Sequence, residues 1–291
     1  MNSARAGWTR EPEPESDVVT PQAAASLHGL LDAPGDPPAA GDPLPPLWHW
    51  LAFLPRVAQR DLGEDGHPHL SGHIDVPEGS RRMFAGGRLA FPGVAKVGDA
   101  LRRKSELLSV EEKSGRSGRL VFVTIRHTLR SSQDVLITDE QDLVYRPGAA
   151  RSSSGAVSAG TSSAGVAAPT GQVPRADFER DLEMTTPLLF RFSALTYNAH
   201  RIHYDRRYAT EVEGYPGLVV HGPLQAVALA ELCRQNLPDM TMTSFSFRAE
   251  RPAFDLGPIH LRADLGPEGA ALASFDSDGA LSTTATATFA G

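Results

Sequence analysis

Two stretches of the sequence bring together residue types that can move a proton and hold a carbonyl oxygen. Residues 196–205, TYNAHRIHYD, place the amide of Asn198 and two imidazoles, His203 among them, around one turn. Residues 219–226, VVHGPLQA, run from an apolar, strand-like start through Gly222 into a helix-forming segment. An imidazole titrates near neutral pH, and the first backbone N–H groups of a helix have no partner within it. These are the two parts needed to add water to, or remove it from, a carbon next to a carbonyl.

His203 is the strongest candidate for moving a proton, and Asn198 lies five positions before it. An asparagine amide can orient a water molecule but cannot act as a base. His221 and Gly222 stand at the expected start of the second helix, with Pro223 in its first turn. The positive end of a helix polarises a carbonyl that points at it and stabilises the enolate that develops there. We therefore expect the Gly222 N–H to hold the carbonyl oxygen.

The composition is that of a globular protein and excludes several other classes. The chain has 291 residues, a hydrophobic content of 41% and a formal net charge of -7, which gives no overall basic field for nucleic acid. No segment is apolar over a membrane-spanning length, and residues 1–15 lack the apolar core of a secretory signal. The single cysteine, Cys233, fits a core position in a reducing compartment. We expect a cytoplasmic protein that binds neither nucleic acid nor membrane.

The chain divides at one segment of low complexity. From residue 147 to 170 the sequence is almost entirely Ser, Gly, Ala, Val, Thr and Pro, which cannot bury enough apolar surface to offset the entropy of ordering. We therefore expect four parts, each defined by its composition. They are a disordered tail at 1–16, an N-terminal domain at 17–146, a flexible linker at 147–174 and a C-terminal domain at 175–291.

The two halves repeat one order of elements, helix first and then short strands bounded by Gly, Pro and Asp. In the first half we expect helices over 20–32 and 46–59 and strands over 87–91, 100–110, 120–129 and 133–144. In the second half we expect a helix-rich region over 205–236 and strands over 241–250, 259–265, 270–275 and 281–290. This repeat predicts an α+β duplication.

The two opening stretches resemble the hydratase-2 motif of MaoC-like, R-specific enoyl-CoA hydratases, Asp-x-Asn-Pro-(Ile/Leu)-His followed by an apolar pair and His-Gly. The resemblance places the family's catalytic histidine on His203 and its oxyanion N–H on Gly222. The family's aspartate falls on Asn198, and its asparagine and proline fall on His200 and Arg201. The Asn198 substitution puts in doubt an acid–base pair copied from the wider family.

A closer resemblance covers nearly the whole chain. Residues 45–55, 81–87, 112–118 and 198–205 are similar to the double hot-dog hydratases of the 3-methylfumaryl-CoA (mesaconyl-CoA) and itaconyl-CoA hydratase group, in which asparagine replaces the aspartate. The resemblance implies two hot-dog units, each a helix wrapped by an antiparallel sheet, with only the C-terminal unit catalytic. It implies reversible hydration of an α,β-unsaturated acyl-CoA thioester without a separate cofactor. A homodimer is an expectation of the fold class.

The substrates of that group carry a free carboxylate, which an arginine binds through two parallel hydrogen bonds. Arg81, Arg82 and Arg201 are the candidates for this role. Lys113 and Arg116 lie in a Gly-rich basic loop that could meet the phosphates of CoA, although a solvated hairpin turn explains such a loop equally well. Two histidines complete the predicted substrate contacts, His200 and His221.

Several alternatives remain open. His200, His203 and His221, or His67, His69 and His73, could bind a metal, but neither set has a familiar ligand spacing, so we expect no metal. Trp48, Trp50 and Phe53 are interpreted as the core of the N-terminal helix, with the shaping of an acyl pocket as a second role. The alternative functions are a fatty 3-hydroxyacyl-thioester dehydratase acting on CoA or carrier-protein substrates, a thioesterase, or a thioester-binding module without turnover.

Overall fold

The structure is a computed structural model that describes residues 12–68, 80–115, 118–147 and 171–291 of the chain. The elements of the N-terminal half are β1 (Glu15–Asp17), α1 (Pro21–Leu30), the 3-10 turns η1 (Trp48–Leu51) and η2 (Gln59–Asp61), β2 (Ser80–Ala90), β3 (Leu101–Gly115), β4 (Gly118–Ser131) and β5 (Asp134–Pro147). Those of the C-terminal half are β6 (Phe178–Glu183), α2 (Thr186–Leu195), the 3-10 turn η3 (Arg201–His203), the π-helical turn η4 (Tyr208–Val212), α3 (Gly222–Asn236), β7 (Thr241–Ala249), β8 (Pro258–Gly266), β9 (Gly269–Phe275) and β10 (Leu281–Ala290).

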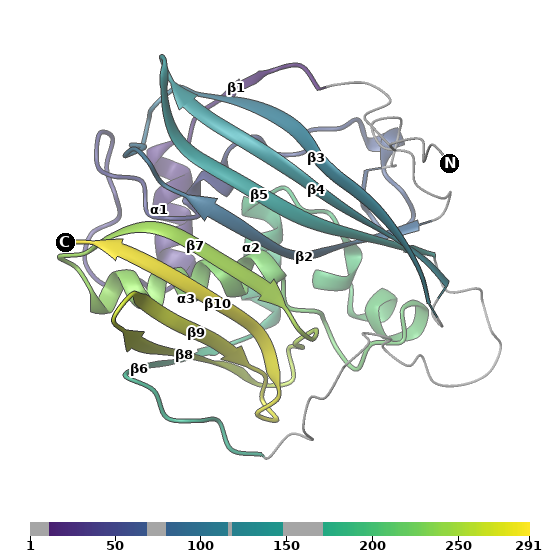
Figure 1. The fold of residues 1–291 in the computed structure, drawn as a ribbon. Helices are drawn as coiled ribbons and strands as arrows, with labels where there is room; N and C mark the ends of the chain where they lie inside the picture. Colours follow the sequence, from purple (N-terminus) through teal and green to yellow (C-terminus); the bar gives the residue numbers. More distant parts are fainter. Residues whose placement is uncertain (1–11, 69–79, 116–117, 148–170) are drawn as a thin grey trace.

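The described strands form one ten-stranded antiparallel sheet in the order β1-β3-β4-β5-β2-β7-β10-β9-β8-β6. Outward from the central β2–β7 pair, the order is β5, β4, β3, β1 on one side and β10, β9, β8, β6 on the other. Strands with the same place in each half thus have the same place in the sheet, which confirms the predicted α+β duplication. The sheet curves, and α1, α2 and α3 lie on its inner side (Figure 1).

The first helix of each half begins with the same local chemistry. The hydroxyl of Thr20 accepts the N–H of Ala23 at the start of α1, and the hydroxyl of Thr185 accepts the N–H of Leu188 at the start of α2. Each helix has a proline in its first turn. A threonine cap satisfies a backbone donor that a helix start leaves unpaired, and proline has no N–H to leave unpaired there.

The second helix of the N-terminal half is shorter than predicted. A helix was expected over 46–59, but in that segment only η1 and Gln59, the first residue of η2, are helical. Leu47, before η1, has φ 70°, and Phe53, after it, has φ 56°. Both are left-handed conformations that a helix cannot include. The C-terminal half has a helix of 15 residues, α3, at the corresponding stage of its chain.

Two other boundaries differ from the sequence predictions. The tail predicted at 1–16 is wrong at its end, because Glu15–Asp17 pairs with β3 as strand β1. Strand β6 has no predicted counterpart, since its alternation of exposed polar residues carries little apolar signal. The linker prediction lies largely outside the described residues. Pro147, the first residue of the predicted linker, is the last residue of strand β5, and residues 171–174 have no regular structure.

The core lies between the sheet and α3. Residues Leu224 to Cys233 of α3 are all buried, so the helix is enclosed on every side rather than amphipathic. The predicted core position of Cys233 is confirmed, and burial raises the pKa of its thiol to about 12. Trp48 and Phe53 are buried as predicted.

The β2–β7 pair needs glycine at two positions. A Cβ on Gly86 would lie 2.5 Å from the Phe247 carbonyl oxygen. A Cβ on Gly87 would lie 2.8 Å from the Glu140 carbonyl oxygen and 2.9 Å from the Phe247 ring. The two halves can approach this closely only because β2 carries no side chain there.

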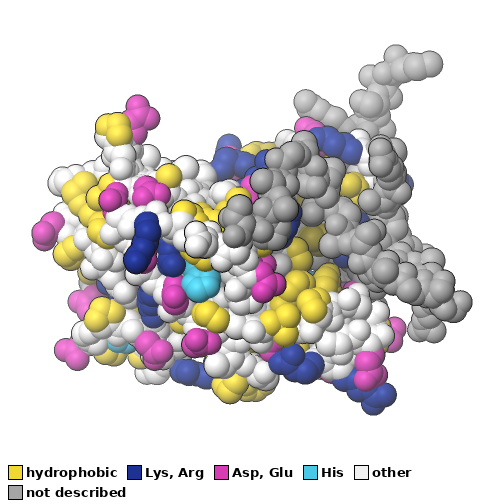
Figure 2. All heavy atoms as spheres, turned by 90° about the horizontal axis from the view of Figure 1, so that it is seen from below, with side chains coloured by type: hydrophobic (Ala, Val, Ile, Leu, Met, Phe, Trp, Pro, Cys, Tyr) yellow, Lys and Arg dark blue, Asp and Glu magenta, His cyan; other side chains and the backbone are white. Residues whose placement is uncertain are grey.

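No helix in the described ranges is long and apolar enough to cross a membrane. On the face of the molecule that Figure 2 shows, side chains of Lys and Arg alternate with those of Asp and Glu. The net charge of -7 is therefore not gathered into one acidic patch on that face.

Because the halves share one sheet, they should unfold together. Phe245 is fully buried in β7 and lies opposite Leu89 of β2. We expect Phe245→Ala to lower the free energy of unfolding by about 3–5 kcal/mol. All three tryptophans, at 8, 48 and 50, lie in the other half. Their fluorescence during urea unfolding therefore reports whether the loss of stability in β7 extends across the β2–β7 pair to the N-terminal half.

The control is Leu265→Ala, at an exposed position of β8, which should leave the midpoint nearly unchanged. A tryptophan transition that keeps the wild-type midpoint in Phe245→Ala, while far-UV circular dichroism shifts, would contradict the coupling of the halves.

Candidate active site

His203 is the last residue of η3 and is 8% exposed. Its Nδ1 lies 2.7 Å from the carbonyl oxygen of Val219. A carbonyl only accepts, so Nδ1 carries the proton and the neutral ring has its lone pair on Nε2. Burial lowers the pKa of His203 to about 4. The ring is therefore neutral at physiological pH, with a basic nitrogen that makes no hydrogen bond to the described residues.

His221 lies flat against His203. The two ring centroids are 3.7 Å apart at an interplanar angle of 19°. Its Nε2 lies 2.8 Å from the Ser193 hydroxyl, and its ring is edge-on to Phe192. Burial, followed by the neighbouring His203 and His200, holds the pKa of His221 well below its usual value. With 1% exposure it cannot touch a substrate, so the predicted substrate contact of His221 is corrected to a packing role behind His203.

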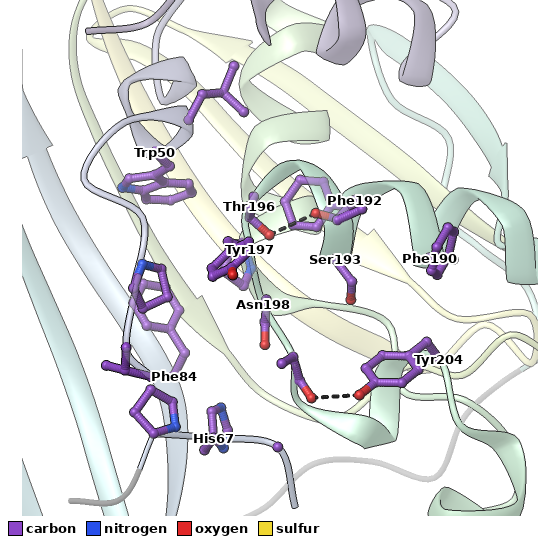
Figure 3. A pocket seen from close by; sticks show the side chains of 18 of the residues that line it. Trp50, His67, Phe84, Phe190, Phe192, Ser193, Thr196, Tyr197, Asn198 and Tyr204 are labelled. Atoms are coloured by element: carbon purple, nitrogen blue, oxygen red, sulfur yellow. Dashed lines mark hydrogen bonds between the residues drawn. The ribbon is translucent and has the colours of Figure 1, made fainter. Parts of the chain in front are cut away.

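Asn198 lies in the turn after α2, and its side-chain oxygen accepts the N–H of His200 at 3.0 Å. This bond uses the amide oxygen and leaves the amide N–H groups as the free donors of the side chain. Asn198 lines a cavity of about 580 Å³. In Figure 3 its side chain points toward the end of the cavity where His67 and Tyr204 lie.

His200 connects the turn at residues 198–203, called the catalytic turn below, to the N-terminal half. Its ring lies 3.9 Å from that of His67 and meets the His203 ring edge-on at 5.4 Å. Burial first, then the charges of His67, His203 and Arg82, lower the pKa of His200 to about 2, against the opposing effect of Asp65. The His200 ring is therefore neutral at physiological pH, and its surroundings disfavour additional positive charge there.

Gly222 is the first residue of α3, as predicted, and Pro223 stands in the first turn. The Gly222 N–H precedes the first intrahelical hydrogen bond, so the helix itself supplies no acceptor for it. A Cβ built on Gly222 would meet only the Phe84 carbonyl oxygen, at 4.0 Å. There is thus open space on the side of Gly222 where a side chain would stand, at the positive end of a 15-residue helix.

The cavity lies between the two halves of the chain. The N-terminal half contributes Trp50, His67, Arg82, Phe84 and Gln141 among others, and the C-terminal half contributes Phe192, Asn198, Tyr204, Pro223 and Val227 among others. His203 and Gly222 are not themselves wall residues, but their neighbours Asn198 and Pro223 are. The prediction that the first half completes the cavity is confirmed.

The predicted cations have different positions. Arg82 of β2 lines the cavity, is exposed, and makes no ion pair among the described residues. Arg201 instead binds Asp205 at 2.7 Å and the Glu64 carbonyl at 3.1 Å, and it covers the Tyr208 ring. These contacts stabilise the turn and leave Arg201 off the cavity wall.

Lys113 lies near the β3–β4 hairpin, where it is 3.7 Å from Glu111 and 4.9 Å from the Phe122 ring centroid. It does not line the cavity. The side chain of Arg81, and all of Arg116, His69 and His73, lie outside the described residues.

One group of described side chains has ligand atoms close enough for a metal ion. These atoms belong to Asp65, His67 and His200 and lie within 4.8 Å of one another. His67 Nδ1 already lies 3.4 Å from an Asp65 oxygen, and the nearby charge of Arg82 opposes a cation. His203 and His221 stack face to face and bind other partners. The absence of a metal requirement stays a prediction.

Sequence reasoning missed the contacts of Ser193 and His67, and it gave Trp50 mainly a core role. The contacts of His67 with His200 and of Trp50 with the cavity join segments that are far apart in the sequence. No local pattern carries that information. Ser193 lies about one helical turn before residues 196–205. It is a polar residue among apolar neighbours, and this was the only local sign that it contacts the site.

Comparison with known proteins places the chain in a family. Residues 47–255 match the family described as hydroxyacyl-thioester dehydratase type 2. The chain is 44% identical over 275 residues to the mesaconyl-C(4)-CoA hydratase of Chloroflexus aurantiacus, covering 90% of this chain and 92% of that protein. A match of 79 residues, also 44% identical, covers 26% of this chain and 26% of the mitochondrial hydroxyacyl-thioester dehydratase type 2 of Schizosaccharomyces pombe.

Solved structures share the fold at low identity. The MaoC-like dehydratase of Phytophthora capsici has a TM-score of 0.67 at 12% identity, covering 96% of each chain. HtdX of Mycobacterium tuberculosis has a TM-score of 0.64 at 17% identity, covering 96% of this chain and 100% of that chain. Another Mycobacterium tuberculosis protein, described as having a double hotdog fold, has a TM-score of 0.52 at 15% identity, covering 98% and 99%. The predicted α+β double hot-dog fold is confirmed.

The family match spans most of the chain, and the Chloroflexus relative aligns with nearly all of it. The chain therefore belongs to the hydroxyacyl-thioester dehydratase type 2 family of MaoC-like hydro-lyases, enzymes that add water to acyl-CoA thioesters or remove it.

Proposed function

We propose that the enzyme hydrates 3-methylfumaryl-CoA, or itaconyl-CoA, reversibly to citramalyl-CoA. The observation that carries this proposal is the neutral His203, beside a helix N-terminus and a cavity lined by Arg82. Within the described residues, His203 Nε2 has no hydrogen-bond partner and Arg82 has no ion-pair partner. The 44% identity to a protein named mesaconyl-C(4)-CoA hydratase supports the same substrate class.

The proposed reaction is written for 3-methylfumaryl-CoA, in which the double bond is conjugated to the thioester, and it uses His203 twice. The oxygen of water forms a bond to Cβ while His203 Nε2 takes one proton from that water. The electron pair of the double bond moves toward Cα and the thioester oxygen, where the Gly222 N–H and the helix N-terminus stabilise the enolate. His203 then returns the proton to Cα. The net change is the addition of one water across the double bond.

Asn198 would hold the water through its amide N–H, since its oxygen already binds the His200 N–H. An amide N–H occupies one lone pair of the water oxygen, which fixes its position and leaves the other lone pair free to attack Cβ. Asn198 therefore orients and does not exchange a proton. In this scheme His203 is the only residue that accepts and donates a proton.

The carboxylate of 3-methylfumaryl-CoA is attached to Cβ, the carbon that water attacks. Its binding group must therefore lie near the catalytic turn. Arg82 meets this requirement, because its charge lowers the pKa of both His67 and His200 and it lines the cavity. Contacts of CoA phosphates with Lys113 and Arg116 remain part of the proposal.

A second candidate is the dehydration of a fatty 3-hydroxyacyl thioester. The buried residues Leu27, Leu47 and Leu51 favour it, because they give one end of the cavity an apolar wall. A panel of acyl thioesters separates the two candidates by the preference for short carboxylated or long alkyl groups. Release of free CoA, followed with a thiol reagent, would instead reveal a thioesterase, and binding without either reaction would indicate a module.

The first test removes the proton carrier. We expect His203→Ala to lower kcat for 3-methylfumaryl-CoA by about 10²–10⁴-fold, the range for a general base. Asn198→Ala should lower it by less, because water can still reach the ring. The assay follows absorbance of the enoyl thioester.

The matched control is His260→Ala, a partly buried histidine of β8 that pairs with Asp181 away from the cavity. This variant should keep wild-type turnover. Unchanged turnover in a folded His203→Ala protein would sink the scheme.

The second test concerns carboxylate recognition. We expect Arg82→Met to raise KM for 3-methylfumaryl-CoA at least tenfold, since one charged hydrogen-bonded partner of a carboxylate is worth about 1.5–3 kcal/mol. The KM for crotonyl-CoA, which has no carboxylate, should change little. Arg88→Met is the control, because Arg88 lies on the same strand but pairs with Glu140 and Asp142. Equal effects of Arg82→Met on both substrates would argue against carboxylate binding.

The third test is the pH dependence. The active form of His203 is neutral and its pKa is lowered to about 4, so kcat/KM should stay constant down to about pH 5 and fall below about pH 4. Unfolded histidine has its usual pKa, here 6.5, so the unfolded state binds protons first and stability decreases as pH falls from 6.5 toward 4. Circular dichroism at each pH separates unfolding from titration. An acid limb near pH 6.5 in folded protein would contradict the buried, neutral His203.

A further inference from the structure

A second cavity, of about 780 Å³, lies in the N-terminal half next to the first. Its wall is polar, with His49, His127 and Asp139 from inside the fold and Arg103 and Asp17 nearer the surface. The two cavities share five wall residues, which are Trp50, Pro55, Val57, Arg82 and Gln141. These shared residues form the partition between the two spaces.

Trp50 is the largest side chain of this partition, and its orientation is fixed. The indole N–H donates to an Asp139 carboxylate oxygen at 2.9 Å. Asp139 is 2% exposed and also accepts from Gln141 at 2.8 Å. The indole packs edge-on against Phe84, at 6.2 Å between centroids, and against Phe247, at 6.0 Å. An indole held by a buried hydrogen bond and two rings has little freedom to move.

The polarity of the cavity walls changes at Trp50, from apolar in the first cavity to polar in the second. On the side of the first cavity, Leu27, Leu47 and Leu51 are at most 5% exposed and form an apolar end. Figure 3 shows Trp50 and His67 at opposite ends of this cavity, with Asn198 between them. An acyl chain whose reacting carbons lie beside Asn198 can extend toward the apolar end, where it reaches the indole.

The partition belongs to the N-terminal half, where the short turn η1 corresponds to the long helix α3 of the C-terminal half. In the C-terminal half, α3 fills the space inside the sheet with buried side chains. In the N-terminal half, the left-handed residues Leu47 and Phe53 limit the helix to four residues. The second cavity lies in that half, and Trp50 of η1 lines both it and the first cavity.

We propose that Trp50 is the residue that sets acyl-chain length, because its indole, bonded to Asp139, closes the acyl cavity and confines the enzyme to short acyl groups. This inference rests on the proposed function and names its substrate class more narrowly. Trp50 determines specificity and takes no part in the proton transfer. When the indole is absent, the two cavities join, and the added space has a polar far end.

The test measures binding rather than turnover, so that it does not depend on hydration. Calorimetry would compare butyryl-, hexanoyl-, octanoyl- and decanoyl-CoA on the wild type, Trp50→Ala and Trp50→Leu. Each methylene that is buried improves affinity about fourfold. The wild type should gain nothing beyond hexanoyl-CoA, whereas both variants should bind octanoyl-CoA at least tenfold tighter than the wild type does and butyryl-CoA within threefold of it.

The polar far end gives a second expected result. Suberyl-CoA, whose eight-carbon chain ends in a carboxylate, should gain less affinity from Trp50→Ala than octanoyl-CoA does, because the far wall carries the carboxylates of Asp17 and Asp139 and its Arg103 is already paired with Glu15. The control is Trp48→Leu, which removes a buried indole from the same turn but from neither cavity wall. Its dependence on chain length should match the wild type.

The outcomes separate this inference from the proposed function. A wild-type protein whose affinity keeps rising from hexanoyl-CoA to decanoyl-CoA, or Trp50 variants with an unchanged length dependence, would overturn the role of Trp50. A protein that hydrates 3-methylfumaryl-CoA but shows either result fails this inference alone. A protein that shows the expected length dependence but hydrates no enoyl thioester fails the proposed function alone.

Discussion

The site depends on the backbone of Val219, which bonds in both directions to the turn that carries the proton carrier. Its carbonyl accepts the Nδ1–H of His203 at 2.7 Å, and its N–H donates to the Ile202 carbonyl at 2.9 Å. Helix α3 begins three residues later, at Gly222. One short segment therefore fixes the tautomer of the imidazole and places the helix N-terminus relative to it. Both reacting groups would lose their alignment if this segment shifted.

The part of the site that sequence could predict is the part built from local structure. Spacing placed His203 and Asn198 in one turn and Gly222 at a helix start, because caps, turns and helix starts leave local signals. Eight of the ten described strands were predicted, because their apolar residues alternate between bounding turns, whereas β1 and β6 were missed and β2 was predicted only over its last residues. Arg82 and Trp50 were named as candidates for carboxylate binding and for shaping an acyl pocket, but their common place on one cavity wall could not be predicted, because it brings together segments that are far apart in the sequence.

The failures of prediction also have physical causes. The helix expected over 46–59 has suitable apolar residues, but Leu47 and Phe53 adopt left-handed conformations that propensity does not reveal. The substrate contact expected of His221 ignored that a histidine before a buried helix can itself be buried. His203 is thus supported from behind by the His221 ring, which is not part of the cavity wall, and His221 is bonded in turn to Ser193, which lines the cavity.

The burial of Cys233 has a chemical consequence beyond packing. Unsaturated acyl thioesters are electrophiles that alkylate free thiolates by conjugate addition, and a hydratase of this family meets them at every turnover. The chain has a single sulfhydryl, which is fully buried in α3 and whose pKa is raised to about 12. Nucleophilic attack requires the thiolate, which is nearly absent at physiological pH under these conditions. The enzyme is therefore protected by its own fold from covalent inactivation by the compounds it handles.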